Sequence, residues 1–409
     1  MLEQLLSDPE TWKHASIPFV AALVGWGTNW VAIKLTFYPV EHMGWRPFPG
    51  WQGIIPSKAE KMGATFVDTT MHRLGSLGEV FDEMEPDKIA AHIIRTVEPK
   101  LDGLIDEVVE QHHAELWSRL PEPVRQNIYN RVRAHLPTLV DELMADIGDH
   151  VEELVDLKDM VTRRLVTDKP LLNRLFLESG DKEFKFIVRS GAYFGFLFGL
   201  VQLGVWALYK GWWVLPLFGF LVGYATNWIA LNLIFRPLNP VEIGPFTVHG
   251  LFLRRQKEVA VVWCRLVTRE IVSVKNIIHN MLDGPHAARS RALIKAGMRG
   301  VVDEAVGVAR GFARLAVGRE GFEQIKEDVG DKAIEVSPEP FDDPVFVEER
   351  AAAVEELLRE RMEGLPSEEF QDLLRPCFKE DEIILILVGA GLGLLAGVAQ
   401  LFLVFGGIS

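Results

Sequence analysis

The sequence is poor in the features that mark enzymes, metalloproteins and nucleic-acid-binding proteins. Only two of its 409 residues are cysteines, Cys264 and Cys377, and their wide separation fits no metal-binding or redox spacing. Acidic residues outnumber basic ones, 57 to 43, and the net charge of −14 argues against a nucleic-acid surface. The sequence contains no glycine-rich phosphate loop and no Ser-His-Asp signature. We therefore expect no enzymatic activity, no catalytic residues, no metal and no cofactor.

One short stretch has a metal-ligand pattern. "EQHHAE" (Glu110–Glu115) contains a Glu-x-x-His pair, Glu110 and His113. Di-iron helix bundles need two such pairs and two further glutamates, and we find no second pair. We interpret the stretch as a solvated helix face.

Four stretches almost lack charge: residues 17–37, 186–208, 213–235 and 383–405. Each is roughly 21–23 residues long, which at ~1.5 Å per residue spans a hydrocarbon core of about 30 Å. Most of the 11 tryptophans lie in or beside these stretches, as in the aromatic belts of membrane proteins. The N-terminus is acidic and no small-residue cleavage site follows it, so we predict a retained membrane helix rather than a signal peptide.

The chain is predicted to be a tandem duplication. "GWGTNWVAIKLTFYP" (Gly25–Pro39) aligns with "GYATNWIALNLIFRP" (Gly223–Pro237) at an offset of 198 residues. At the same offset, "GAYFGFLFGLVQ" (Gly191–Gln202) aligns with "GAGLGLLAGVAQ" (Gly389–Gln400). Because each copy has an even number of spans, the two repeats should be parallel, related by an axis near the membrane normal.

The predicted fold class is an all-α integral membrane protein with four transmembrane helices in two parallel repeats, each enclosing a long helical soluble segment. Repeat 1 covers residues 1–209 and has its soluble segment at 39–185. Repeat 2 covers residues 210–409 and has its soluble segment at 237–381. Whether the two soluble segments form one bundle or two is left open.

The soluble segments are predicted to be helical because apolar residues recur in them at helical spacing, for example at Val124, Ile128 and Val132. Asp343 and Pro344 predict the start of a helix, with an N-cap residue followed by proline at the first position. No strand-like alternation or hairpin signal competes over a comparable length.

Basic residues predict the orientation in the membrane. They gather at the ends of the spans that face the soluble segments, as Arg189 and Arg236 do, against Lys13 and Lys210 at the opposite ends. By the positive-inside rule, the soluble segments are predicted to be cytoplasmic.

Polar residues inside the spans are the first candidate site. An amide in lipid must face protein or water, and small residues beside it allow close helix approach. One interpretation is helix packing, with the glutamines as amide partners and glycine ridges on the opposing helices. The other is a polar pocket or pathway at the repeat interface, although no ionisable residue lies at mid-membrane. The candidates are Thr28, Asn29, Trp30, Thr226, Asn227, Trp228, Gln202 and Gln400.

Basic residues near the cytoplasmic ends of the spans are the second candidate site. They lie at the end of a duplicated motif or in the stretches "GIIPSKAEK" (Gly53–Lys61) and "GLFLRRQKE" (Gly250–Glu258) that follow. They either contact anionic lipid headgroups or only set the topology. The candidates are Lys58, Lys61, Arg236, Arg254, Arg255 and Lys257.

The duplicated Thr-Asn-Trp helix, "VDLKDMV" (Val155–Val161) and "GDKEFKFIVRSGAYFGFLFGLVQ" (Gly180–Gln202) resemble a bacterial membrane-protein family. It is the domain of unknown function 445, which includes uncharacterised protein family 0754. The resemblance covers nearly the whole chain. It implies a multi-pass protein of the bacterial cytoplasmic (inner) membrane with a large helical soluble part, and it implies no particular activity.

Two functional hypotheses follow from these features. The first is a membrane-anchored helical scaffold that forms a homo-oligomer and recruits an unknown cytoplasmic or envelope protein. The alternative is a lipid or small-solute conduit or transporter with a polar site at the repeat interface. Asn29 and Asn227 would contribute to that site, and amphipathic helices could enclose an apolar groove. Membrane lipids are expected partners in both cases, and nucleic acid in neither.

Overall fold

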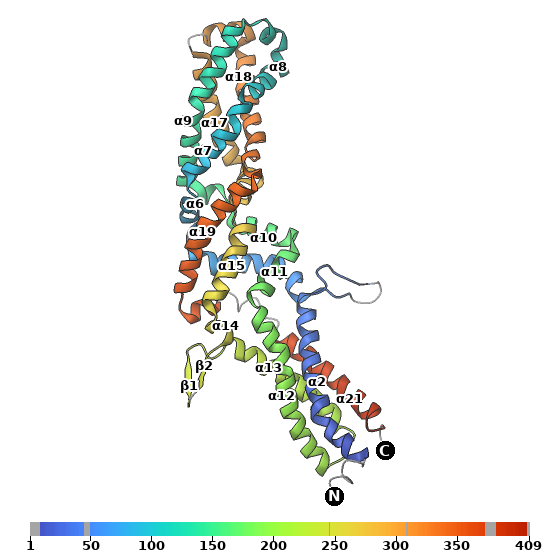
Figure 1. The fold of residues 1–409 in the computed structure, drawn as a ribbon. Coiled ribbons are helices and arrows are strands. Elements are labelled where there is room, and N and C mark those ends of the chain that lie inside the picture. The colour runs from blue at the N-terminus through green and yellow to red at the C-terminus, as the bar shows by residue number, and fades with distance from the viewer. Residues whose placement is uncertain (1–8, 45–49, 245, 308–309, 373–381, 407–409) are drawn as a thin grey trace. The chain divides into compact units, whose positions relative to one another are not determined.

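The computed structural model describes residues 9–44, 50–244, 246–307, 310–372 and 382–406 (Figure 1). The chain divides into two compact units. Unit 1 consists of Met1–Thr70, Leu165–Trp263 and Arg361–Ser409, and unit 2 of Met71–Arg164 and Cys264–Glu360. Each unit therefore takes segments from both predicted repeats.

The predicted class, an all-α protein with four helices long and apolar enough to cross a membrane, is confirmed. The four helices are α2 (Pro9–Phe37), α12 (Asp181–Leu208), α13 (Val214–Phe235) and α21 (Glu382–Leu403). The ends of α2, α12 and α13 match the predicted spans, whereas α21 ends two residues early. Helices α2 and α12 begin eight and five residues before the predicted spans, and the starts of α13 and α21 differ by one residue. The division into two parallel repeats stays a prediction.

The four spanning helices alternate in direction. The start of α2 and the start of α13 share a buried cluster with the ends of α12 and α21, formed by Ile17, Val214, Leu215, Trp206 and Leu401. Ala32, near the other end of α2, packs with Leu385 at the start of α21. Both α2–α12 and α13–α21 are closely packed pairs.

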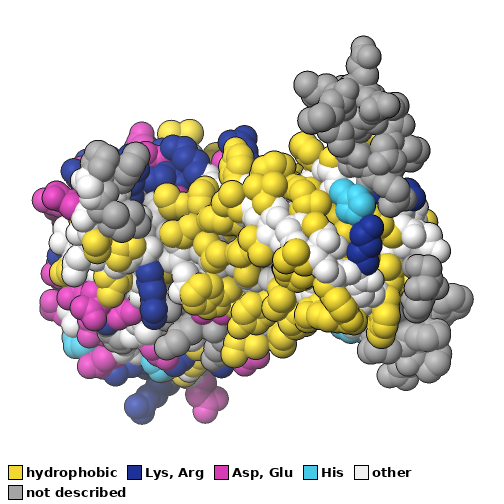
Figure 2. Space-filling view, turned by 90° about the horizontal axis from the view of Figure 1, so that it is seen from below, with side chains coloured by type: hydrophobic (Ala, Val, Ile, Leu, Met, Phe, Trp, Pro, Cys, Tyr) yellow, Lys and Arg dark blue, Asp and Glu magenta, His cyan; other side chains and the backbone are white. Residues whose placement is uncertain are grey.

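The outer surface of the spanning helices is apolar. Large side chains on it are mostly exposed, among them Phe19, Leu23, Tyr193, Leu197 and Leu395. Figure 2 shows hydrophobic side chains gathered over a broad area that carries few charged side chains. Contiguous apolar surface of this kind is expected where helices face lipid, since the backbone is already satisfied inside each helix.

Shorter elements complete unit 1: α3 (Ile54–Ser57), α4 (Ala59–Phe66), α11 (Lys169–Ser179) and α14 (Leu251–Arg254). After α13, β1 (Val241–Ile243) and β2 (Phe246–Val248) form an antiparallel hairpin that the sequence pattern did not predict. Three-residue strands are too short to show an alternation that would be recognised. Gly244 has a φ of +61°, which glycine adopts without the steric cost of a side chain.

Three helices begin in one unit and end in the other: α10 (Leu157–Thr167), α15 (Gln256–Glu270) and α19 (Pro344–Gly364). The predicted start of α19 is confirmed, because Asp343 Oδ1 accepts hydrogen bonds from the backbone of Val345 at 2.9 Å and Phe346 at 3.3 Å. The short π-helix Val67–Met71 and helix α5 (His72–Leu74) also lie at a boundary between the units.

Unit 2 is one helical assembly built from both soluble segments. The first segment supplies α6 (Leu77–Glu83), α7 (Pro86–Val97), the 3₁₀ turn Glu98–Lys100, α8 (Leu101–Arg119) and α9 (Glu122–Leu154). The second supplies α16 (Val274–Asp283), α17 (Ala287–Val306), α18 (Arg310–Val336) and the 3₁₀ turn Glu339–Asp342. Helix α9 packs on α6, α7, α8 and α17, while α18 packs on α8 and α17.

Candidate functional site

The two intramembrane asparagines make matching contacts. Asn29 Nδ2 donates to the backbone oxygen of Ile187 at 2.7 Å, which ties α2 to α12. Asn227 Nδ2 donates to the backbone oxygen of Leu385 at 2.9 Å, which ties α13 to α21. Both asparagines are buried. Each amide therefore joins two helices at a position equivalent by the offset of 198 residues.

The predicted glycine ridges are where these helices approach each other. A Cβ atom added at Gly25 would overlap the carbonyl group of Gly191, and one at Gly223 would overlap that of Gly389. Close approach of this kind lets an amide on one helix reach a carbonyl on the next.

The threonines and tryptophans of the intramembrane set make contacts that differ from those of the asparagines. Thr28 and Thr226 donate to backbone oxygens of their own helices, Gly25 at 3.2 Å and Gly223 at 3.4 Å. Trp30 and Trp228 are 46% and 50% exposed and lie on the outer surface.

The two glutamines are buried but do not pair with the asparagines. The hydrogen-bond partners of the asparagines are backbone carbonyls, and Asn29 Oδ1 is left without a partner. Gln400 Nε2 is also buried without a partner in the part of the chain that the structure describes. The expected glutamine–asparagine pairing is therefore replaced by a side chain–backbone contact.

Arg255 holds unit 1 together rather than standing free for a lipid headgroup. Its Nη1 lies 2.7 Å from both carboxylate oxygens of Glu183, which is only 4% exposed, and its Nε donates to Glu258 at 3.0 Å. Burial alone would lower the pKa of Arg255, but the hydrogen bond and charge of Glu183 raise it. Among the other basic candidates, Lys58 is half-buried. The remaining ones are exposed: Lys61, Arg236, Arg254 and Lys257.

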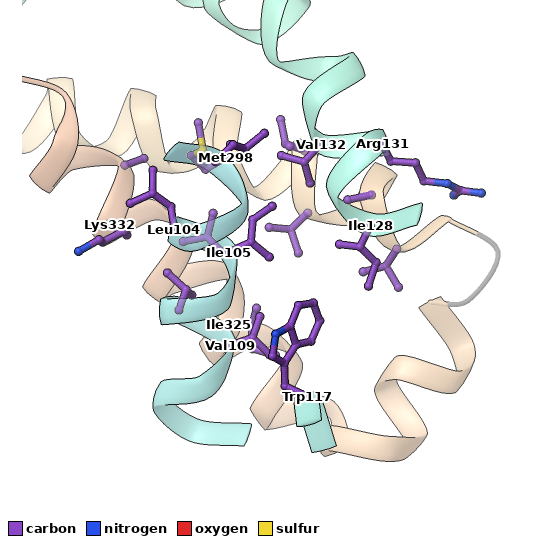
Figure 3. A pocket seen from close by; sticks show the side chains of 18 of the residues that line it. Leu104, Ile105, Val109, Trp117, Ile128, Arg131, Val132, Met298, Ile325 and Lys332 are labelled. Atoms are coloured by element: carbon purple, nitrogen blue, oxygen red, sulfur yellow. The ribbon is translucent and has the colours of Figure 1, made fainter. Parts of the chain in front are cut away.

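Unit 2 contains a cavity of about 830 Å³ that the sequence did not predict as a site (Figure 3). Its wall comes from the end of α7 and from α8, α9, α17 and α18. Of its 29 lining residues, 25 are apolar, so the wall offers little to a water-soluble ligand. Labelled members in the view are Leu104, Ile105, Val109, Trp117, Ile128, Val132, Met298 and Ile325.

The breadth of the apolar face on α8 explains why a cavity forms here. Leu104-Ile105 and Val108-Val109 are consecutive apolar pairs, so the apolar stripe of this helix is wider than one neighbouring helix can cover. The helix also breaks at His113, whose φ of −135° and ψ of 36° are not helical. Both features leave space between the helices. The doubled pairs are the sequence signal that could have indicated the cavity.

A half-buried carboxylate fixes the aromatic part of the wall. Asp106 Oδ1 accepts from Trp117 Nε1 at 2.8 Å and also from the hydroxyl of Tyr129. Burial and then the hydrogen bond to Asp106 raise the pKa of Tyr129 to about 12. Trp117 is thereby held with its ring against the cavity and its nitrogen satisfied.

Polar groups at the cavity are few and include no carboxylate among the lining residues that the structure describes; they are His113, Asn127, Arg131 and Lys332. Lys332 Nζ pairs with Glu107 at 2.7 Å and with Glu335 at 3.2 Å, and the hydrogen bonds to Glu107 and then Glu335 raise its pKa. Glu110 is exposed and His113 half-buried. Within the described ranges, no three His, Cys, Asp or Glu side chains cluster as metal ligands would.

Comparisons with known proteins find membrane proteins. The chain is 25% identical to a UPF0754 membrane protein of Nostoc sp. over 175 residues, which are 41% of this chain and 40% of the relative. It is 31% identical to a UPF0754 membrane protein of Microcystis aeruginosa over 90 residues, 22% of this chain and 20% of the relative. The match thus spans less than half the length of these curated relatives. No protein-family model and no solved structure matches the chain.

The predicted resemblance to this family of membrane proteins is confirmed by these two relatives, at modest identity and over part of the chain. Together with four apolar helices, it supports a membrane location and a lipid environment.

Proposed function

We propose that this UPF0754-like membrane protein binds a lipid in the cavity of unit 2. The observation that carries the proposal is the cavity itself, about 830 Å³ in volume and apolar at 25 of its 29 lining residues. Ligand pockets commonly measure ~300–1,000 Å³ and are lined mainly by hydrophobic and aromatic side chains. The proposal keeps the lipid ligand of the conduit hypothesis but places it in unit 2 rather than at a polar site at the repeat interface, and it assigns no catalytic step.

A lipid suits the site for two physical reasons. An alkyl chain gains about 0.8 kcal/mol for each CH₂ group that leaves water, which requires no polar partner from the wall. An unfilled apolar cavity is destabilising in proportion to its volume, so an occupant stabilises the folded unit. The membrane in which the spanning helices lie is a ready source of such chains.

The scaffold hypothesis predicts a different outcome from the same unit. A scaffold needs its outer helical surfaces and gains nothing from a filled cavity. Neither the homo-oligomer nor a cytoplasmic or envelope protein partner is needed for lipid binding, and both stay predictions. We further propose that the protein resides in the bacterial cytoplasmic membrane with unit 2 on the cytoplasmic side.

Native mass spectrometry of the full chain, extracted gently in its own lipids, tests the proposal. Ile128→Trp should fill part of the cavity, because Ile128 points into it in Figure 3. Ala134→Trp is the matched control, since Ala134 is exposed on the same helix and does not line the cavity. We expect one retained lipid in the wild type and in Ala134→Trp, and at least a several-fold loss of that lipid in Ile128→Trp.

The thermal unfolding temperature of Ile128→Trp should not fall, because added apolar volume replaces empty space. A wild-type protein free of lipid, or equal retention in both variants, would contradict the proposal and leave the scaffold hypothesis standing.

A further inference from the structure

The charged residues that line the cavity of unit 2 are all basic, and a purely apolar ligand would not need them. Its described lining residues include two cations, Arg131 and Lys332, and no Asp or Glu. The chain as a whole has the opposite balance, with 57 acidic residues against 43 basic ones. In Figure 3 the two cations lie at opposite ends of the labelled apolar side chains.

The two cations differ in what already neutralises them. Lys332 is held by Glu107 and Glu335, so its charge and its donors are used within the protein. Arg131 is half-buried and makes no ion pair or hydrogen bond with any residue in the described part of the chain. A guanidinium offers five donors in a planar fork that fits a carboxylate or phosphate.

The end of α17 leaves space for the guanidinium of Arg131. Gly307, with a φ of +51°, follows the last residue of this helix, and a Cβ atom there would overlap Nη1 of Arg131. The absence of a side chain therefore makes room for the guanidinium. The negative end of the α17 dipole favours a cation here, but no described residue accepts a hydrogen bond from the guanidinium. The carboxylate of Glu304, three residues before Gly307 in the chain, is paired with His135 at 2.9 Å.

We infer that the ligand of the cavity is an anionic amphiphile, with its apolar chain among the aliphatic side chains and its carboxylate or phosphate on Arg131. The inference rests on the proposed function and adds the class of headgroup. A neutral lipid would satisfy the apolar wall equally well and leave Arg131 without an acceptor.

The test uses three brominated probes and the full chain in nanodiscs of neutral phosphatidylcholine. The probes are dibromostearate, dibromostearyl alcohol and a dibromostearoyl lysophosphatidic acid. Bromine quenches tryptophan at short range, and Trp117 lies in the cavity wall. Subtracting the quenching of Trp117→Phe isolates this residue from the tryptophans in or near the membrane.

We expect at least one anionic probe to bind about tenfold more tightly than the alcohol, since a hydrogen bond to a charged group contributes at this level. Arg131→Gln should remove that difference without changing the affinity for the alcohol, and Arg131→Lys should restore part of it. Arg119→Gln, which removes an exposed cation from the same unit, should leave all affinities unchanged. Tighter binding of dibromostearate would indicate a fatty acid as the ligand. Tighter binding of the lysophosphatidic acid would indicate a phosphate-bearing lipid.

Equal binding of the alcohol and both anions, or equal weakening of all three in Arg131→Gln, would overturn the headgroup inference while the proposed lipid site stands. Absence of Trp117 quenching by any probe in the wild type would overturn the proposed function, and the headgroup inference with it.

Discussion

Asp106 shows how one residue stabilises the wall of the cavity. Its carboxylate accepts hydrogen bonds from Trp117 and Tyr129, two aromatic residues on different helices. The rings themselves meet edge to face, with centroids 6.2 Å apart. Since both aromatic side chains are buried, loss of the carboxylate would leave two donors unsatisfied, which is more costly than the loss of either bond alone.

The pKa of Tyr129 gives a prediction about alkaline stability. Its folded-state pKa of about 12 is above the ordinary value of 10.0, so the folded state holds the phenolic proton more tightly than the unfolded state. The resulting stabilisation should be fully present below pH ~10 and be lost as the pH rises toward ~12. Spectrophotometric titration of tyrosinate should show this late ionisation in the wild type. The ionisation should be absent from Tyr129→Phe, which would assign it to Tyr129.

Tyr129→Phe should also flatten the decline of unfolding free energy over the same pH range. If the wild type and the variant lose stability in parallel there, Tyr129 is not the group responsible. The four other tyrosines are present in both proteins, so the difference between the two proteins reports on Tyr129 alone.

At the scale of elements, the spanning helices depend on the absence of side chains at particular positions. A Cβ atom at Gly393 would overlap the carbonyl oxygen of Gly219 on α13, whereas one at Gly391 would meet nothing within 4 Å. Both glycines lie on α21, so they share the same membrane and the same helix. Alanine substitution at the two positions changes helix propensity in the same way, but only the substitution at Gly393 affects the contact with α13.

Gly393→Ala should destabilise the protein by about 1–3 kcal/mol, because the extra methyl group forces α13 and α21 apart. Gly391→Ala should be neutral or slightly stabilising, since alanine is the better helix former. Denaturant unfolding of the full chain in detergent, followed by its helical signal, measures both. Equal losses in the two variants would mean that the α13–α21 contact does not depend on the close approach.

At the scale of the whole molecule, the alternating directions of the four spans imply a topology. The loop between α12 and α13 lies at the end of the bundle where α2 begins and α21 ends. The segments that build unit 2 leave from the opposite ends of these helices. A residue of that loop and a residue of unit 2 should therefore be accessible from opposite sides of the membrane.

Single cysteines in a Cys264→Ala, Cys377→Ala background test this topology. Ser118→Cys lies at an exposed position of unit 2, and Lys210→Cys lies in the exposed loop after α12. An impermeant maleimide should label Ser118→Cys only in inside-out vesicles and Lys210→Cys only in right-side-out vesicles. The reverse pattern would contradict the cytoplasmic orientation, and labelling of both from one side would contradict the four-span topology.

The sequence by itself determined the features that depend on local composition. Runs of apolar residues as long as a bilayer is thick identified the four spans, and Asp343-Pro344 identified the start of α19. Helical spacing of apolar residues in both soluble segments identified their class. These features depend on residues that are close together in the sequence, so hydropathy and periodicity are enough to identify them.

Only the tertiary structure decided which distant groups meet. Asn29 was expected to need a partner, but its proximity to the backbone of Ile187 follows from the packing of α2 on α12. Arg255 could have faced lipid, yet it pairs with Glu183, which lies 72 residues away in the chain. The cavity, and Arg131 at its wall, likewise depend on how five helices from both soluble segments pack together. Partners of this kind are set by three-dimensional packing, which local sequence patterns do not specify.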